Sequence, residues 1–137
     1  MLSKEYCKNL IKKRKKEYNK IKELHCSCFE ETVVFNARGF YHLRYHVNGR
    51  ERSIKEQIYK LNLFPLAVPV IKKATKVYSQ ENRNFVTIKR KKEKGQKKKA
   101  YYWTLKEIAG RKNVKIKIVL RKVGDGKLHF WSIMKIR

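Results

Sequence analysis

Histidines at two distant places in the chain are the residues whose types could do chemistry. His42 lies in "GFYHLRYH", and His129 lies with Ser132 in "GKLHFWSIMK" near the end of the sequence. Imidazole can accept or donate a proton near neutral pH. RNA is cleaved without metal when a base takes the proton of its 2'-hydroxyl, an acid protonates the leaving 5'-oxygen, and fixed cations stabilise the phosphate. His42 and His129 are therefore candidate proton-transfer residues, neither of them assigned as acid or base.

The neighbours of His42 are basic. His46 is four positions further on and shares its face of a short helix that we expect over residues 37–46. This spacing also suits a metal pair, but no Glu stands beside the first histidine and no third ligand is obvious, so we expect no metal or other cofactor. The alternative is a partly buried histidine packed beside Tyr41 and Tyr45. Phosphate contacts are expected from His46 and from the flanking arginines, Arg38, Arg44, Arg50 and Arg52.

The last strand presents a geometric difficulty. Strict alternation places His129, Trp131, Ile133 and Lys135 on one face and Ser132 on the other. Either a β-bulge re-aims one of them, as happens near active sites, or His129 and Ser132 do not share a site. A hydrogen-bonded structural histidine is the competing interpretation of His129.

Composition favours a polyanionic partner. The chain has 37 Lys and Arg against 11 Asp and Glu, a formal net charge of +26 on 137 residues. Nucleic acid is the first candidate and an anionic membrane surface the second. The longest apolar run, residues 61–71, is too short to span a membrane and contains two prolines. We expect a cytoplasmic protein without a secretory signal, with its three cysteines reduced.

The elements that must position these residues indicate an α+β fold: N-terminal helices packed on a four-stranded antiparallel β-sheet meander. One domain, 1–137, is expected, with a basic N-terminal helix in 1–28, a short strand and helices in 29–80, and the sheet in 83–137. The helices are predicted over residues 3–25, 37–46, 53–63 and 65–78, and a short strand over residues 32–35. The meander strands are predicted over residues 84–90, 99–108, 113–121 and 127–136, with Asp125-Gly126 as the strongest hairpin signal.

Aromatic and lysine-rich segments offer further contacts to nucleic acid. In "AYYWTLKEI" at least one ring of Tyr101, Tyr102 and Trp103 should point away from the core, and a tyrosine there could stack on a base. The lysine runs at residues 12–16 and 89–99 would contact phosphates, or simply be solvated, without choosing a sequence. "HCSC", with His25, Cys26 and Cys28, is too tightly spaced for a usual zinc finger, so inert thiols are expected.

The residues together resemble a known family, the small metal-independent ribonuclease domains of the barnase, EndoU, colicin and RelE type, especially phage and mobile-element members. The resemblance rests on "GFYHLRYH" followed by "GRERS", on the helix-then-meander order, and on "GDGKLHFWSIMK", which is similar to the family's His-Phe-x-Ser closing strand. It implies His42, Arg52, His129 and Ser132 as catalytic residues, with Lys135 as a further phosphate binder. Family members include toxins that cut tRNA or messenger RNA.

Two functions from different classes follow. The first is a toxin-like endoribonuclease that needs no metal, acts on RNA such as tRNA or mRNA, and has an inhibitor or immunity protein as a candidate partner. The second is a non-catalytic RNA- or DNA-binding module, for which both histidines would be dispensable. A weaker third candidate is a small ribosome-associated or assembly protein that uses its basic helix.

Overall fold

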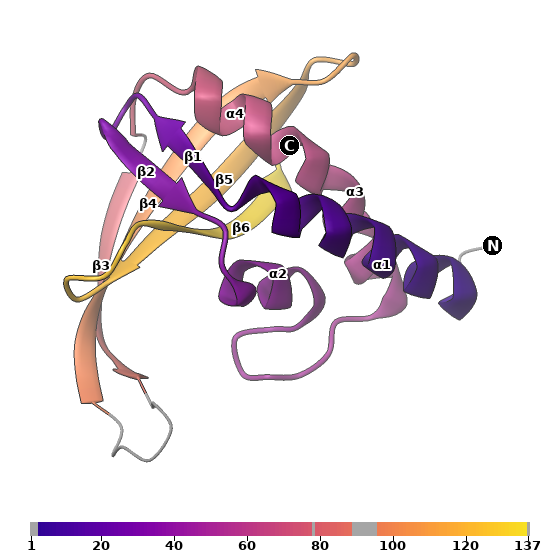
Figure 1. Cartoon of the computed structure of the whole chain (residues 1–137), viewed down its shortest axis with the longest axis horizontal. Coiled ribbons are helices and arrows are strands. Elements are labelled where there is room, and N and C mark those ends of the chain that lie inside the picture. The colour runs from indigo at the N-terminus through magenta and orange to yellow at the C-terminus, as the bar shows by residue number, and fades with distance from the viewer. Residues whose placement is uncertain (1–2, 78, 89–95, 137) are drawn as a thin grey trace.

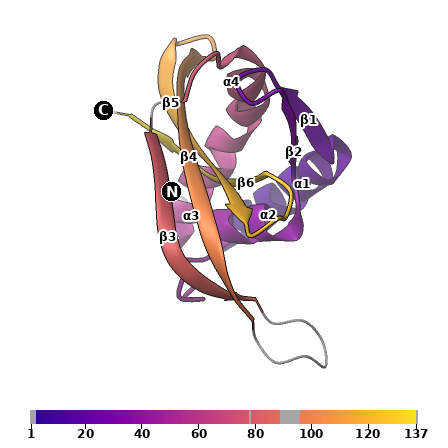
Figure 2. The same cartoon turned by 90° about the vertical axis from the view of Figure 1, so that its left-hand side faces the viewer.

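The fold is α+β, as the sequence predicts. The computed structural model describes residues 3–77, 79–88 and 96–136. In chain order the elements are α1 (Lys4–Ile21), β1 (Glu23–Cys26), β2 (Glu31–Val34), α2 (Ala37–Arg44), α3 (Ile54–Leu63), a 3-10 turn η1 (Phe64–Leu66), α4 (Ala67–Lys73), β3 (Ser79–Ile88), β4 (Gln96–Ala109), β5 (Val114–Val123) and β6 (His129–Lys135). The helices lie on one side of the sheet (Figures 1 and 2). None of the described helices is long and apolar enough to cross a bilayer.

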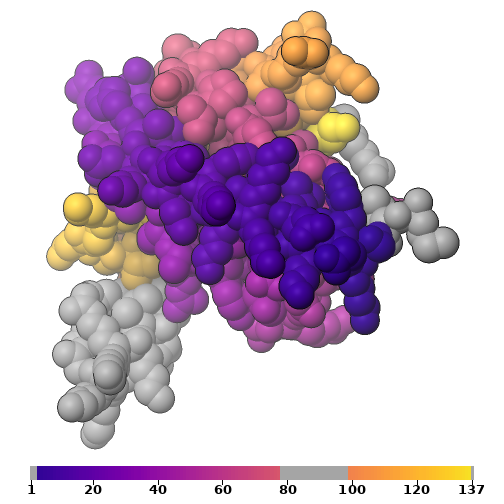
Figure 3. Space-filling view, turned by 45° about the vertical axis from the view of Figure 1, so that its right-hand side comes forward, coloured from indigo at the N-terminus to yellow at the C-terminus, as the bar shows by residue number. Residues whose placement is uncertain are grey.

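Helix α1 begins where its capping residue predicts. The side chain of Ser3 accepts a hydrogen bond from the Tyr6 amide at 3.0 Å. Cys7, Leu10 and Tyr18 form the buried stripe, and the exposed lysines follow the opposite face (Lys4, Lys8, Lys12, Lys13, Lys15, Lys16 and Lys20). In Figure 3 the indigo atoms of α1 lie at the front, on the outer surface. The predicted extension to His25 is wrong, because the chain turns at Lys22, which has a φ of +57°, and then pairs as β1.

Capping residues and prolines mark the starts of the remaining helices. Asn36 caps α2, and Ser53 caps α3 by accepting from the Glu56 amide at 3.1 Å. Pro65 lies in the 3-10 turn and Pro69 in the first turn of α4, where a missing amide N–H costs no helix bond. The helix predicted to reach Tyr78 ends at Lys73. Tyr78 itself, Arg90 and most of the lysine run at residues 89–99 lie outside the described residues.

The sheet is larger than predicted. Strands β3, β4, β5 and β6 do form an antiparallel meander, but the described part of the sheet has six strands in the order β1-β2-β6-β5-β4-β3. Residues 23–26, expected in the first helix, pair with β2, and β2 lies parallel to β6 through Val34 and His129. The four-stranded, purely antiparallel prediction is therefore wrong, since a hairpin early in the sequence is added to the free edge of the last strand.

The core lies between the helices and the covered face of the sheet. Phe130 of β6 stacks on Phe35 at 5.4 Å between ring centroids and meets Tyr18 and Phe64 edge-on. Helix α2 crosses close to this strand at Gly39, where an added Cβ would collide with the Tyr18 hydroxyl and would lie 2.7 Å from the Phe130 carbonyl oxygen. Figure 1 shows α2 beside β6. The absence of a side chain at Gly39 is what allows α2 to approach the strand.

Helix α3 supplies hydrogen-bond partners for the part of β6 that β2 does not pair. The Lys60 ammonium donates to the Ile133 carbonyl at 2.7 Å in a buried position, and the Lys135 amide donates to the Tyr59 hydroxyl at 2.8 Å. Burial, followed by the charge of Arg52, lowers the pKa of Lys60 to about 8. A buried backbone carbonyl without a partner is costly, so Lys60 stabilises the edge of β6.

Replacing Lys60 with methionine should destabilise the fold by about 1–3 kcal/mol, because the Ile133 carbonyl would lose its buried partner. Urea unfolding monitored by tryptophan fluorescence measures the change. The matched control is Lys55→Met, an exposed lysine on the same helix. Equal stabilities for the two variants would contradict the role of Lys60.

Gly39→Ala should cost about 1–3 kcal/mol, because the new methyl group overlaps the Tyr18 hydroxyl and the Phe130 carbonyl. The same variant should disturb the Trp131 environment, since α2 must move away from β6. Thermal unfolding and near-ultraviolet circular dichroism provide the two measurements. An alanine variant as stable as the wild type would show that the contact at Gly39 is not tight.

Candidate active site

An extra residue in β6 brings His129 and Ser132 to one face. His129 pairs with Arg121 and Phe130 with Leu120, whereas Ser132 pairs with Val119, so Trp131 is the residue left over. Residues 119 and 121 of β5 point to the same face, and therefore His129 and Ser132 do as well. Of the two alternatives that the sequence leaves open, the bulge is the one found. This face is the one that the main hydrophobic core does not occupy.

Trp131 is the centre of a cluster of rings and charges, which we call the Trp131 cluster: His42, Tyr102, Arg121, His129 and Trp131. The His42 imidazole stacks on the indole at 4.5 Å and 19°. The Arg121 guanidinium carbon lies 3.9 Å from the centroid of the indole ring. His129 and Tyr102 meet the indole edge-on, each at 6.1 Å. Two histidines that are 87 positions apart in the sequence thus contact one indole.

Both ring nitrogens of His129 face polar partners. Arg121 Nε donates to Nε2 at 3.1 Å, and Nδ1 lies 3.5 Å from the Lys127 carbonyl oxygen. The arrangement assigns the proton of the neutral ring to Nδ1, because Nε2 must accept. Burial, together with the Arg121 guanidinium, lowers the pKa of His129 to about 4. At neutral pH this imidazole is uncharged and 6% exposed.

The His42 side chain is more exposed to solvent than the His129 side chain. Its backbone carbonyl accepts a hydrogen bond from Arg52 Nε at 3.1 Å, but its ring nitrogens have no hydrogen-bond partner within the described residues. Burial, followed by the charges of Arg52, Lys60 and Arg121, lowers its pKa to about 4. His42 is therefore a partly exposed imidazole that is unprotonated at pH 7, as a general base must be, but its low pKa makes it a weak base until a bound anion offsets the neighbouring cations.

The arginines around His42 separate into two groups. Arg38 acts electrostatically on both Arg121 and His129. Arg52 instead ties α2 to α3, since it donates to the His42 carbonyl and to the Glu56 carboxylate at 3.2 Å and lies 3.5 Å from His46 Nδ1. Arg44 donates to Gln57 and pairs with Glu51. Arg38 therefore acts on the Arg121 and His129 side of the Trp131 cluster, and Arg52 acts on the His42 side.

The structure does not bring every predicted residue together. Lys135 pairs with Ile116, a core residue, so it lies on the helix-covered face and not on the face of His129 as alternation predicts. Tyr101 also points to the helix-covered side, where it stacks on Trp103 at 6.0 Å. Tyr102 belongs to the Trp131 cluster but is only 6% exposed. His46 and Arg50 lie in the turn after α2, where the His46 amide donates to the Arg50 carbonyl at 2.8 Å.

Arg121 and Trp131 are the important residues that the sequence interpretation leaves out of the site. A hairpin with a two-residue turn at Asp125-Gly126 would place Lys122 opposite His129. The actual connection is longer, with strands ending at Val123 and resuming at His129, so that Arg121 takes this position. Lys122 points to the other face and pairs with Glu31 at 2.8 Å. The basic character of residues 121 and 122 is visible in the sequence, but the register that selects one of them is not.

The described residues contain no group of three His, Cys, Asp or Glu side chains that could hold a metal ion, although the Cys26 and Cys28 sulfurs lie 3.5 Å apart. Burial raises the pKa of the Cys28 thiol to about 12. Comparison of the chain with family models, curated proteins and solved structures finds no match.

The low pKa of His129 predicts a pH dependence of stability. An unfolded histidine binds a proton near pH 6.5, whereas the folded one does so near pH 4. The unfolded state thus binds more protons between these values, so the contribution of His129 is complete above about pH 6.5 and is lost as pH falls to 4. We expect it to amount to about 3 kcal/mol.

Urea unfolding at several pH values between 7 and 4 tests this expectation. His129→Gln should reduce the fall in the free energy of unfolding across this window. His25→Gln, which changes an exposed histidine on β1, should leave the fall unchanged. Equal slopes for the two variants would show that His129 is not held neutral by its surroundings.

Proposed function

We propose that this protein is a metal-independent endoribonuclease, toxin-like in kind, that cleaves RNA by transesterification through the 2'-hydroxyl. The observation that carries the proposal is the His42 imidazole, which stacks on Trp131, the indole that His129 meets edge-on, and whose ring nitrogens have no hydrogen-bond partner among the described residues. Burial and neighbouring cations lower its pKa, so the ring is unprotonated at pH 7. The net charge of +26 would hold the polyanionic substrate. The resemblance to the barnase, EndoU, colicin and RelE type of domain points the same way, with tRNA or mRNA as substrate.

In the proposed reaction His42 accepts the proton of the 2'-hydroxyl. The 2'-oxygen then attacks phosphorus, the bond to the 5'-oxygen breaks, and the products carry a 2',3'-cyclic phosphate and a 5'-hydroxyl. Arg121 and Arg38 stabilise the charge on the non-bridging oxygens. Ser132, buried on the same face as His129, is a positioning group.

His129 is the proposed acid, and the substrate itself would prepare it for this role. In the free protein Arg121 occupies Nε2, and burial together with the charge of Arg121 lowers the pKa of His129. A phosphate bound at Arg121 neutralises that charge and competes for the guanidinium, so the pKa rises and Nε2 becomes available. Protonated His129 can then donate to the leaving 5'-oxygen.

The second candidate is a non-catalytic RNA- or DNA-binding module. The engagement of both His129 nitrogens favours it, because a histidine held by Arg121 and the Lys127 carbonyl serves equally well as a structural residue. The row of exposed lysines on α1 suits binding without cleavage.

Cleavage of tRNA and of a synthetic single-stranded RNA in excess EDTA separates the two candidates. His42→Phe keeps a ring against Trp131 but has no nitrogen, and should slow single-turnover cleavage by at least about 100-fold while binding changes little. His25→Phe is the control on an exposed histidine. Products with 2',3'-cyclic phosphate ends would support the nuclease. Binding without cleavage by the wild type would leave the binding module.

A further inference from the structure

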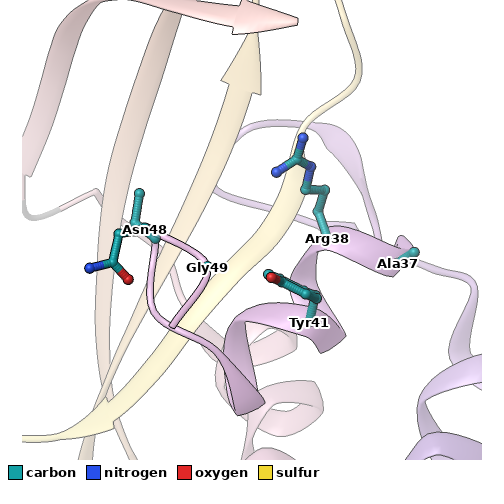
Figure 4. Close-up of a pocket in the computed structure, with 6 residues that line it drawn as sticks. Ala37, Arg38, Tyr41, Asn48 and Gly49 are labelled. Atoms are coloured by element: carbon teal, nitrogen blue, oxygen red, sulfur yellow. The ribbon is translucent and has the colours of Figure 1, made fainter. Parts of the chain in front are cut away.

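A cavity of about 450 Å³ lies between α2 and the turn that follows this helix, and Tyr41, which lines the cavity, directly precedes His42 of the Trp131 cluster. It is lined by Ala37, Arg38 and Tyr41 of α2 and by Val47, Asn48 and Gly49 of the following turn. Figure 4 shows Tyr41 extending from α2 towards the turn that carries Gly49, with Arg38 on the same helix. Its size is within the usual range of ligand pockets.

The turn that lines one side of the cavity is stabilised by hydrogen bonds within the turn. The Gly49 amide donates to the His46 carbonyl at 2.9 Å, and the Arg50 amide donates to Asn48 Oδ1 at 3.0 Å. Gly49 has a φ of +86°, and an added Cβ would lie 3.8 Å from the Tyr41 hydroxyl. The turn therefore faces the tyrosine across a short gap.

Tyr41 presents an accessible aromatic surface at the cavity. Its ring stacks on Tyr45 at 4.4 Å and 12°, an arrangement that occupies one face and holds the ring in place. The side chain is 44% exposed and lines the cavity, so the ring offers aromatic surface to a flat group bound there.

The polar groups at the cavity match the edge of a nucleobase and its phosphate. Asn48 uses its Oδ1 in the turn, so its two amide N–H donors are left for a ligand with carbonyl or ring-nitrogen acceptors. Arg38 also acts electrostatically on Arg121 and His129, and this places the cavity next to the proposed cleavage centre. A flat, acceptor-bearing ligand with an attached phosphate fits these features.

We propose that this cavity holds one unpaired base of single-stranded RNA, stacked on Tyr41 and read by Asn48, while Arg38 contacts the adjoining phosphate. The inference rests on the proposed function for the position of the cavity relative to cleavage. Bases of single-stranded RNA can leave the stack and lie on aromatic side chains, whereas paired bases cannot. The cavity thereby makes the protein selective for unpaired regions and for the base that accepts from Asn48.

Binding to RNA that cannot be cleaved tests the cavity independently of catalysis. The probes are four fluorescent octamers fully substituted with 2'-O-methyl groups, one for each base, and an RNA duplex of the same length. Tyr41→Ala should weaken single-strand binding by about 5- to 100-fold, as loss of base stacking does, and leave duplex binding unchanged. Tyr6→Ala is the control, since Tyr6 on α1 has a similar exposure of 47%.

Asn48→Asp provides a second variant that preserves the turn, because the carboxylate keeps the acceptor for the Arg50 amide. It removes the amide donors, so the order of preference among the four octamers should change. Tyr41→Phe should retain the wild-type affinity. These two variants separate base recognition from any loss of folding in Tyr41→Ala.

The outcomes distinguish failure of the inference from failure of the proposed function. Weakened, reordered single-strand binding by the cavity variants supports the cavity even if the wild type cleaves nothing, in which case only the nuclease fails. If Tyr41→Ala and Asn48→Asp bind all probes as Tyr6→Ala does, the cavity proposal is overturned, whether or not RNA is cleaved. Equal losses on duplex and single strand would also overturn it, since a paired duplex offers no base to the cavity.

Discussion

The arrangement of the candidate site depends on one additional residue in β6. Without the bulge at Trp131, the alternation of the strand would put His129 and Ser132 on opposite faces. The bulge also points the indole to the face that carries Arg121 and Tyr102, and there the His42 ring stacks on it. A local change in one strand thus joins the helical half of the chain to the sheet.

The His42 ring of α2 can stack on this indole because two other contacts hold the helices close to β6. Gly39 lets the helix approach the Phe130 carbonyl, and Lys60 of α3 satisfies the Ile133 carbonyl on the strand edge that β2 leaves free. The helices thus satisfy part of the strand edge, and α2 places the His42 ring on Trp131.

The two histidines of the Trp131 cluster have similarly low pKa values but different hydrogen bonds. In a cationic, partly dry environment both are neutral at pH 7, because protonation would add charge beside arginines. The ring nitrogens of His42 have no hydrogen-bond partner among the described residues, whereas Arg121 holds the acceptor nitrogen of His129. A bound phosphate is the natural means of changing that balance, since it is the one component of the proposed reaction that carries negative charge. In the proposed reaction, His129 would therefore become protonated, and able to act as the acid, only when the RNA phosphate is bound.

The sequence by itself determined the features that depend on nearby residues. Ser3 and Ser53 mark helix starts through hydrogen bonds that span three positions, and the second half of the chain reads as strands of a meander. The polyanionic partner that the excess of lysine and arginine indicates stays a prediction. The tertiary structure alone decided the addition of β1 and β2 to the sheet, the position of Arg121 opposite His129, and the exclusion of Lys135 from their face. The physical reason is that register and bulges are set by partners distant in the sequence, and a slip of one residue turns every side chain of a strand to the other face. The low pKa values of His42 and His129 follow from that same packing, because burial and neighbouring charges exist only once the chain has folded.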